Sequence, residues 1–290
     1  MTGRGQAPGW TGPEPGAFQA RAGDTTPGAV MPRRHRVRKV VLRTLGVLVA
    51  VAVLAVAGFG LLLLITPSAG QAEQLAQAQD RAHNVAYPGP PVPARFAAAL
   101  VATEDHRFYS DPGVDPIAVF RVAWGYLRGD GPQQGGATIT QQLAKLLYTP
   151  DQSSLKAEAE QVAMAVKLNF SYSKAQILQM YADVNYYGQN YYSLGAASCG
   201  YFGVPPAQLT WSQSALLAGA VNGPTLFDPL THPAAARARE SHVLSRLSAT
   251  GVLTPEQASA ALAAPLNLVP SWRSLSPPPA GSDSCGGLRD

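Results

Sequence analysis

Two adjacent carboxylates, Glu104 and Asp105, are the residues of this sequence best placed for acid–base chemistry. They follow an apolar segment, residues 94–103, which is predicted to be a short helix. A helix end would hold one acid in place, and a fixed carboxylate can take the proton of an attacking hydroxyl group. Glu-Asp pairs are common in proteins, so the pair alone does not establish a site.

A second helix is predicted further along, where the sequence reads GGATITQQLAK. Thr138, Gln142 and Lys145 are spaced at i, i+4 and i+7, so they share one face, while apolar residues share another that can be buried. A helix N-terminus favours anions through its free N–H groups and its dipole. With Lys145 two turns along, the helix start near Gly136 is a candidate site for phosphate or diphosphate.

The elements that must position these residues are predicted to be helices. Ser173, Thr210 and Thr254 are each followed three residues later by Gln, the pattern of a capping box at a helix start. Strand-like alternation is nearly absent, so we predict an all-α domain.

A long uncharged segment near the N-terminus, residues 44–65, is predicted to be a transmembrane helix. At about 1.5 Å per residue it reaches roughly 33 Å, enough for a hydrocarbon layer of about 30 Å. The basic cluster 33–39 precedes it, and residues 44–79 contain no Lys or Arg. We therefore expect the N-terminus in the cytoplasm and the domain outside it. A cleaved signal peptide is the alternative, but its apolar core is normally about 7 to 15 residues long.

The positive charge of the chain is concentrated around this segment. Residues 1–70 hold 8 Lys and Arg against 2 Asp and Glu, whereas residues 71–290 hold 14 against 16. The net charge of +4 is therefore a topology signal, and we expect no nucleic-acid partner.

Composition divides the chain into five predicted segments. Gly and Pro dominate the N-terminal region, a Gln/Ala-rich stretch and the Pro-rich YPGPPVP follow the apolar segment, and the C-terminal end lacks a core-forming pattern. The segments are a disordered basic cytoplasmic arm (1–43), the transmembrane helix (44–65), a stalk or linker (66–93), the helical domain (94–268) and a disordered tail (269–290).

Two groups of residues have competing interpretations. The tyrosines Tyr186, Tyr187, Tyr191 and Tyr192 either line a sugar groove or pack a loop. Cys199 and Cys285 are permitted to form a disulfide outside the membrane, but we expect a small packed residue and a free thiol in the tail.

The ordered motifs resemble those of the peptidoglycan glycosyltransferases, the domain of bifunctional penicillin-binding proteins and of monofunctional transglycosylases. The resemblance covers roughly residues 95–247 and implies a lysozyme-like helical glycosyltransferase domain preceded by one transmembrane helix. Its motifs are Glu104 and Asp105 with Phe108 and Gly113, GGATITQQLAK, Lys174 with ILQMY, the tract YYGQNYYSLGAASCGYFG, and the late Arg239.

The resemblance implies that the chain polymerises lipid II into glycan strands of peptidoglycan, with inversion and release of undecaprenyl diphosphate. Glu104 and Asp105 would be catalytic, and Glu104 would be the general base. A divalent cation, Mg or Mn, would bridge phosphate oxygens. The implied partners are lipid II, the nascent glycan strand, the membrane bilayer, and transpeptidases or other cell-wall assembly proteins. The implied substrate-binding residues are Gly136, Thr138, Gln141, Gln142, Lys145, Lys156, Glu160, Gln161 and Arg239.

The third motif of the family, a basic pair followed by Glu, is the least preserved. Counting without gaps puts the Glu at Gln161 and the basic pair at Ala157 and Glu158. Gln161 is the predicted equivalent, Glu160 is the alternative, and Lys156 would have to reach back to the diphosphate. Other departures from the family pattern are Asp111 for His, Ala137 for Ser, Leu146 for Asn, and Gln179 and Asp183 for Glu and Asn.

These departures leave two alternatives to an active polymerase. One is a weakly active or non-catalytic member that binds lipid II within a cell-wall assembly. The other is a peptidoglycan-cleaving enzyme of similar fold, which is disfavoured because cleavage of finished glycan needs neither Lys145 nor a diphosphate site.

Overall fold

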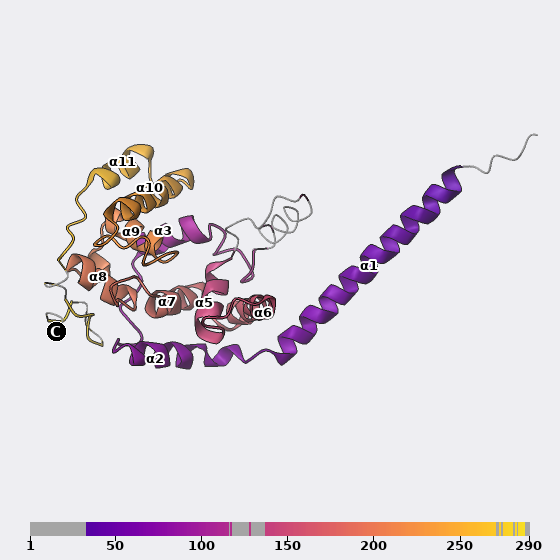
Figure 1. Cartoon of the computed structure of the whole chain (residues 1–290), viewed down its shortest axis with the longest axis horizontal. Coiled ribbons are helices and arrows are strands. Elements are labelled where there is room, and N and C mark those ends of the chain that lie inside the picture. The colour runs from indigo at the N-terminus through magenta and orange to yellow at the C-terminus, as the bar shows by residue number, and fades with distance from the viewer. Residues whose placement is uncertain are drawn as a thin grey trace, which may run out of the picture. The chain divides into compact units, whose positions relative to one another are not determined.

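The computed structural model describes residues 33–115, 117, 128, 137–270, 273, 275–280, 282 and 284–287. In these ranges the regular elements are helices, with one isolated antiparallel bridge between Tyr186 and Tyr192. The all-α prediction is confirmed. The α-helices are α1 (Arg33–Ile65), α2 (Ala72–Ala82), α3 (Ala94–Glu104), α5 (Ile139–Tyr148), α6 (Leu155–Ser171), α7 (Lys174–Val184), α8 (Leu194–Phe202), α9 (Trp211–Ala220), α10 (Pro233–Ala249) and α11 (Pro255–Ala263), and two short 3-10 helices are η1 (Ala69–Gln71) and η2 (Pro206–Gln208) (Figure 1).

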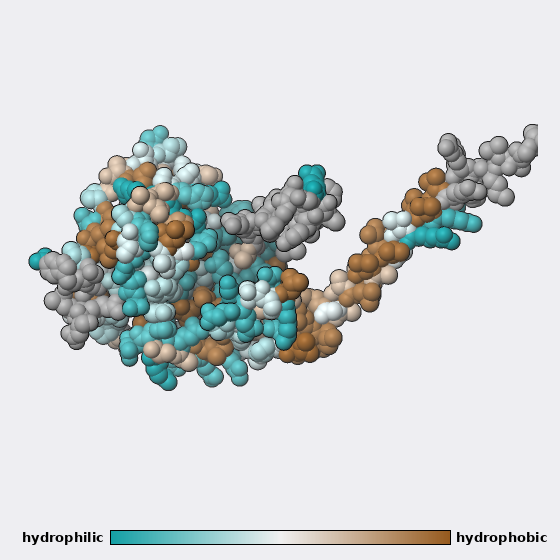
Figure 2. Space-filling model, in the orientation of Figure 1, coloured by the Kyte–Doolittle hydropathy of each residue, from teal (hydrophilic) through white to brown (hydrophobic). Residues whose placement is uncertain are grey.

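Helix α1 contains the predicted transmembrane segment. Of the helices in the described ranges, it is the one long and apolar enough to cross a membrane. Apolar side chains cover it beyond its basic end (Figure 2). The helix begins at Arg33, so residues 33–43 are helical and the predicted disorder of this part is wrong. Arg and Lys are good helix formers, and neither Gly nor Pro interrupts the stretch. The rest of the predicted arm lies outside the described residues.

Helix α2 belongs to the helical domain and packs against α7. The chain leaves α1 through a short turn, where the Lys167 ammonium donates to the Thr66 carbonyl oxygen at 2.8 Å. The prediction of a stalk is therefore wrong over α2, because small side chains at helical spacing give this Gln-rich stretch a face that can be buried. The buried residues of α2 are Ala72, Ala76 and Asp80.

The core of the domain lies between the apolar faces of the remaining helices. Helix α3 packs against α9 and α10, while α5 packs against α6 and α7. This packing brings together the ends and faces that carry the predicted site residues. The largest buried side chains include Phe96, Leu100, Ile139, Leu143, Leu168, Ile177 and Tyr181.

The Pro-rich segment before α3 is held against α7 by two residues of the fourth motif. The Gln179 side chain accepts from the Val92 N–H at 3.1 Å and donates to the Pro90 carbonyl oxygen at 3.1 Å. Asp183 accepts from the Gly89 N–H at 3.2 Å. Gln179 and Asp183 therefore help to place the start of α3.

The tyrosine cluster mainly packs a loop. Tyr187 and Tyr191 are buried in the core. Tyr186 and Tyr192 are half-buried, and the His83 ring stacks on Tyr192 with ring centroids 3.4 Å apart. This stacking joins the end of α2 to the loop before α8.

A disulfide between Cys199 and Cys285 attaches the tail to α8. Pro278 of the tail is buried and lies against Gly195, where an added Cβ would meet Pro278 Cδ at 3.2 Å. The predictions of unpaired cysteines and of a disordered tail are therefore wrong for the described tail residues. The two cysteines are 86 residues apart, and no local sequence pattern indicates that the chain returns to α8.

Candidate active site

The Glu104 carboxylate is at the end of α3 and is held from two directions. Its side chain is 8% exposed. Oε1 accepts a hydrogen bond from Arg239 Nη2 at 2.9 Å, and Oε2 accepts one from Gln142 Nε2 at 3.2 Å. Helices α3, α5 and α10 thus meet at this carboxylate. Each carboxylate oxygen has a further lone pair, so Glu104 can still accept a proton from a substrate hydroxyl.

The orientation of Gln142 is set by Tyr181. The Tyr181 hydroxyl donates to Gln142 Oε1 at 2.7 Å, so the amide nitrogen of Gln142 faces Glu104. Burial raises the pKa of Tyr181 well above its usual value, which keeps this hydroxyl a donor. The apolar periodicity of α7 indicates only a core role for Tyr181. The hydroxyl group could have indicated a further role, because a buried Tyr usually has a hydrogen-bond partner.

Arg239 is positioned by α9 as well as by Glu104. Its Nε donates to the Gly219 carbonyl oxygen at 3.1 Å, and its guanidinium lies over the Phe227 ring, 5.6 Å from the centroid. A Cβ on Gly219 would come within 2.8 Å of Arg239 Cγ, so glycine is needed for this close approach. The predicted residues Glu104, Gln142 and Arg239 are therefore brought together.

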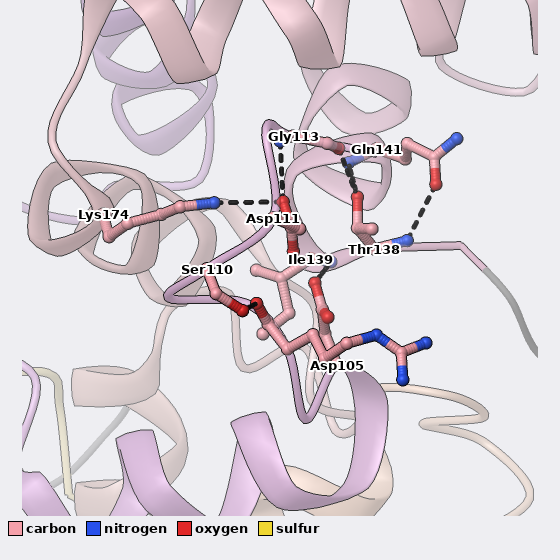
Figure 3. A network of polar contacts seen from close by, with 9 residues as sticks. Asp105, Ser110, Asp111, Gly113, Thr138, Ile139, Gln141 and Lys174 are labelled. Carbon is pink, nitrogen blue, oxygen red and sulfur yellow. Dashed lines mark hydrogen bonds and ion pairs between the residues drawn. The ribbon is translucent and has the colours of Figure 1, made fainter. Parts of the chain in front are cut away.

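Thr138 and Gln141 form the start of α5. The Thr138 hydroxyl accepts from the Gln141 N–H at 3.1 Å and donates to the Gly113 carbonyl oxygen at 2.6 Å, while Gln141 Oε1 accepts from the Thr138 N–H at 2.8 Å (Figure 3). Both side chains are thus engaged in helix capping. Their contact with substrate stays a prediction, and Gly136 lies outside the described residues.

Asp105 also supports the start of α5. Its Oδ2 accepts from the Ile139 N–H at 3.2 Å (Figure 3). Burial and the nearby charge of Asp111 raise the pKa of Asp105 to about 7. The two adjacent acids therefore have different surroundings, and Glu104 is the one that contacts Gln142 and Arg239.

Lys145 lies one turn beyond Gln142 on α5 and is exposed. Among the described residues it has no hydrogen bond or ion pair, so its ammonium is free to contact an anionic ligand. The same ranges contain no group of three or more His, Cys, Asp or Glu side chains that could hold a metal ion. The divalent cation stays a prediction.

The third-motif residues lie on two faces of α6. Gln161 Nε2 donates to Thr149 Oγ1 at 2.9 Å and so faces the end of α5. Lys156 and Glu160 pair with each other at 3.6 Å, and the Lys156 side chain is 84% exposed. Ala157 is buried, so the family's basic residue would not fit there without rearrangement. Their contact with substrate stays a prediction, with Gln161 directed at the end of α5 and Glu160 engaged with Lys156.

This chain is similar in sequence to known proteins over the helices that carry these residues. The transglycosylase family model matches residues 71–248, from just before α2 to near the end of α10. Penicillin-binding protein 1A of Aquifex aeolicus is 36% identical over 177 residues, which are 61% of this chain and 24% of that protein. Penicillin-binding protein 1A of Escherichia coli is 37% identical over 166 residues, 57% of this chain and 20% of that protein.

A third relative, penicillin-binding protein 1A of Mycobacterium tuberculosis, is 36% identical over 173 residues, 58% of this chain and 21% of that protein. The chain thus spans less than a quarter of the length of each of these three relatives. The family model, in contrast, covers more than half of this chain. The chain therefore belongs to the transglycosylase family, which confirms the family and the enzyme class predicted from its motifs.

Proposed function

We propose that this protein is a membrane-anchored glycosyltransferase that polymerises lipid II into glycan strands. The observation that carries the proposal is the Glu104 carboxylate, which Gln142 and Arg239 hold at 3.2 and 2.9 Å. This arrangement suits a general base, because the carboxylate is oriented and shielded but keeps a free lone pair. The relatives bear the name penicillin-binding protein, which supports a role in the cell wall.

In the proposed reaction, the 4-hydroxyl of the acceptor sugar attacks the anomeric carbon of the growing chain. The new carbon–oxygen bond forms as the bond from that carbon to the diphosphate breaks, so the configuration inverts. Glu104 takes the hydroxyl proton, and undecaprenyl diphosphate leaves with the bonding electron pair. Gln142 and Arg239 keep the carboxylate aligned with the attacking oxygen.

The leaving diphosphate would be held by Lys145, with the dipole of α5 adding a weaker attraction, because the Thr138, Ile139 and Gln141 N–H groups already have partners. Lys145 is exposed on the same helix as Gln142, so its flexible side chain can reach a charged group near Glu104. The cap formed by Thr138 and Gln141 keeps that helix start in shape. Negative charge that develops on the leaving group is thereby stabilised.

The test is incubation of the purified full-length protein with labelled lipid II in vesicles. We expect a ladder of glycan strands that retain the undecaprenyl diphosphate. Binding without polymer would instead support the non-catalytic, lipid II-binding alternative. Release of soluble fragments from finished peptidoglycan would support a cleaving enzyme.

We propose that the domain lies outside the cytoplasm. The basic residues before the apolar part of α1 support this orientation, and the Cys199–Cys285 disulfide suits an oxidising compartment. Because those two cysteines are paired, an introduced cysteine provides the single free thiol.

A cysteine introduced by Gly5→Cys should resist a membrane-impermeant thiol reagent in intact cells and react after lysis. Ser153→Cys, at an exposed position before α6, is the matched control and should react in intact cells. Labelling of the Gly5→Cys variant in intact cells would show that the N-terminus lies outside the cytoplasm, the opposite of the proposed orientation.

The third motif gives a further expected result. Glu160→Gln removes an exposed ion pair with Lys156, which contributes about 0–1 kcal/mol to stability, so the domain should stay folded and the polymerisation rate should change little. Gln161→Glu alters the residue that faces Thr149 and should change the rate more. Polymerisation assays of the two variants at equal protein concentration measure this. Loss of activity in the Glu160 variant alone would make Glu160 the functional acid of the motif.

A further inference from the structure

Asp105, which follows Glu104 in the chain, and Asp111 in the loop after α3 form an acid pair that the proposed reaction does not use. Both residues are buried, with 6% and 7% exposed, and their carboxyl groups are close enough to share a hydrogen bond. Oδ2 of Asp111 is buried and has no hydrogen-bond partner among the described residues. Two ionised carboxylates in such a place repel one another, and one of them takes up a proton.

The charges around the acid pair balance only one of its two carboxylates, so the other carboxyl group is expected to hold a proton. Lys174 of α7 donates to Oδ1 of Asp111 at 3.1 Å and balances one carboxylate (Figure 3). Arg107 is also near the pair, but it forms its ion pair with Asp115. One negative charge of the pair is therefore matched by a cation and the other is not.

We propose that Asp111 is a positioning residue for Glu104 and that it shares a single proton with Asp105. In this arrangement the carboxylic acid of Asp105 donates to Oδ2 of Asp111, while Oδ2 of Asp105 accepts from the Ile139 N–H. Oδ1 of Asp111 also accepts from the Gly113 N–H at 2.6 Å. The acid pair thus joins the end of α3, the loop that follows and the start of α5.

The consequence is a dependence on pH. Burial, with the charge of Asp111, raises the pKa of Asp105 to about 7, while the Ile139 N–H and Lys174 lower it in part. A raised pKa means that the folded state holds the proton more tightly than the unfolded state. The stabilisation of the folded state by this proton is therefore complete below the unfolded pKa of about 3.9. It is lost as pH rises through about 7.

Above that pH, repulsion within the ionised acid pair would move the end of α3 away from the start of α5. Glu104 would then lose its alignment with Gln142, although the residues that bind substrate remain. The inference rests on the proposed function, because it predicts a fall in kcat at alkaline pH with little change in KM.

The experiment compares the pH profiles of kcat and KM for lipid II polymerisation by the full-length protein. We expect the wild-type kcat to fall by up to about tenfold per pH unit above about 7. Asp111→Asn keeps the shape and the acceptor but removes the second charge. This variant should not show the fall in kcat above about pH 7, the alkaline limb of the profile, because Asp105 can then ionise without repulsion.

Asp183→Asn is the matched control. Burial raises the pKa of Asp183 to about 7 as well, but it lies about nine residues beyond Lys174 on α7, roughly 13 Å along the helix. Both variants should change the pH dependence of thermal stability. Only Asp111→Asn should change the alkaline limb of kcat.

Thermal unfolding between about pH 5 and 9 needs no substrate, so it tests the shared proton independently of activity. If neither the wild type nor any variant makes polymer, the proposed function is refuted, but this measurement still tests the shared proton. Relative to wild type, Asp111→Asn should gain stability as pH rises through about 7. A stability difference that does not vary with pH would overturn the shared proton. An unchanged alkaline limb would overturn the positioning role.

Discussion

Replacing Glu104 by Gln should lower the rate of lipid II polymerisation by about 10²–10⁴-fold, the usual effect of losing a general base. An amide has nearly the same shape as the carboxylate but cannot take the proton of the attacking hydroxyl. Its oxygen can still accept from Arg239, so α3 and α10 should remain packed. The measurement is the initial rate of glycan formation, with thermal unfolding as the check on folding.

Glu256→Gln is the control for this variant, because it makes the same chemical change at an exposed residue in the first turn of α11. The two variants should therefore differ by at least tenfold in rate at equal stability. If Glu104→Gln kept most of the wild-type rate, the base would have to be another residue.

Loss of the disulfide should cause the largest fall in stability among these changes. Cys285→Ser opens a link across 86 residues, and removing a native disulfide typically costs about 2–5 kcal/mol. The substitution leaves the buried Cys199 in place, so α8 keeps its packing. The melting temperature should fall by several degrees, because about 1 kcal/mol shifts it by roughly 2–4 °C in a domain of this size.

Reductant provides the control for the disulfide. The wild-type protein with reductant should melt at the temperature of Cys285→Ser, and reductant should not shift the variant further. The polymerisation rate well below the melting temperature should change little, since the disulfide contacts none of the proposed catalytic side chains. Equal melting temperatures of wild type and variant would show that the tail does not stabilise the domain.

The sequence alone was sufficient to determine the features that depend on neighbouring residues. The capping boxes predicted at Ser173, Thr210 and Thr254 all form, because each is completed within one turn of helix. The same holds for the end of α3, where Glu104 follows an apolar helical segment. The buried face of α5 likewise follows from the helical period.

Only the tertiary structure decided which distant residues meet. Arg239 reaches Glu104 across 135 residues of sequence, and the orientation of Gln142 depends on a hydroxyl of α7. The packing of α2 follows from where helices cross, and the pairing of Cys199 with Cys285 depends on the path by which the tail returns to α8. Periodicity shows that a helix has an apolar face, but the partner of that face is set by the fit of side chains from several helices at once. A residue such as Arg239 can therefore be predicted as functional from its motif, while its contact with Glu104 requires the folded domain.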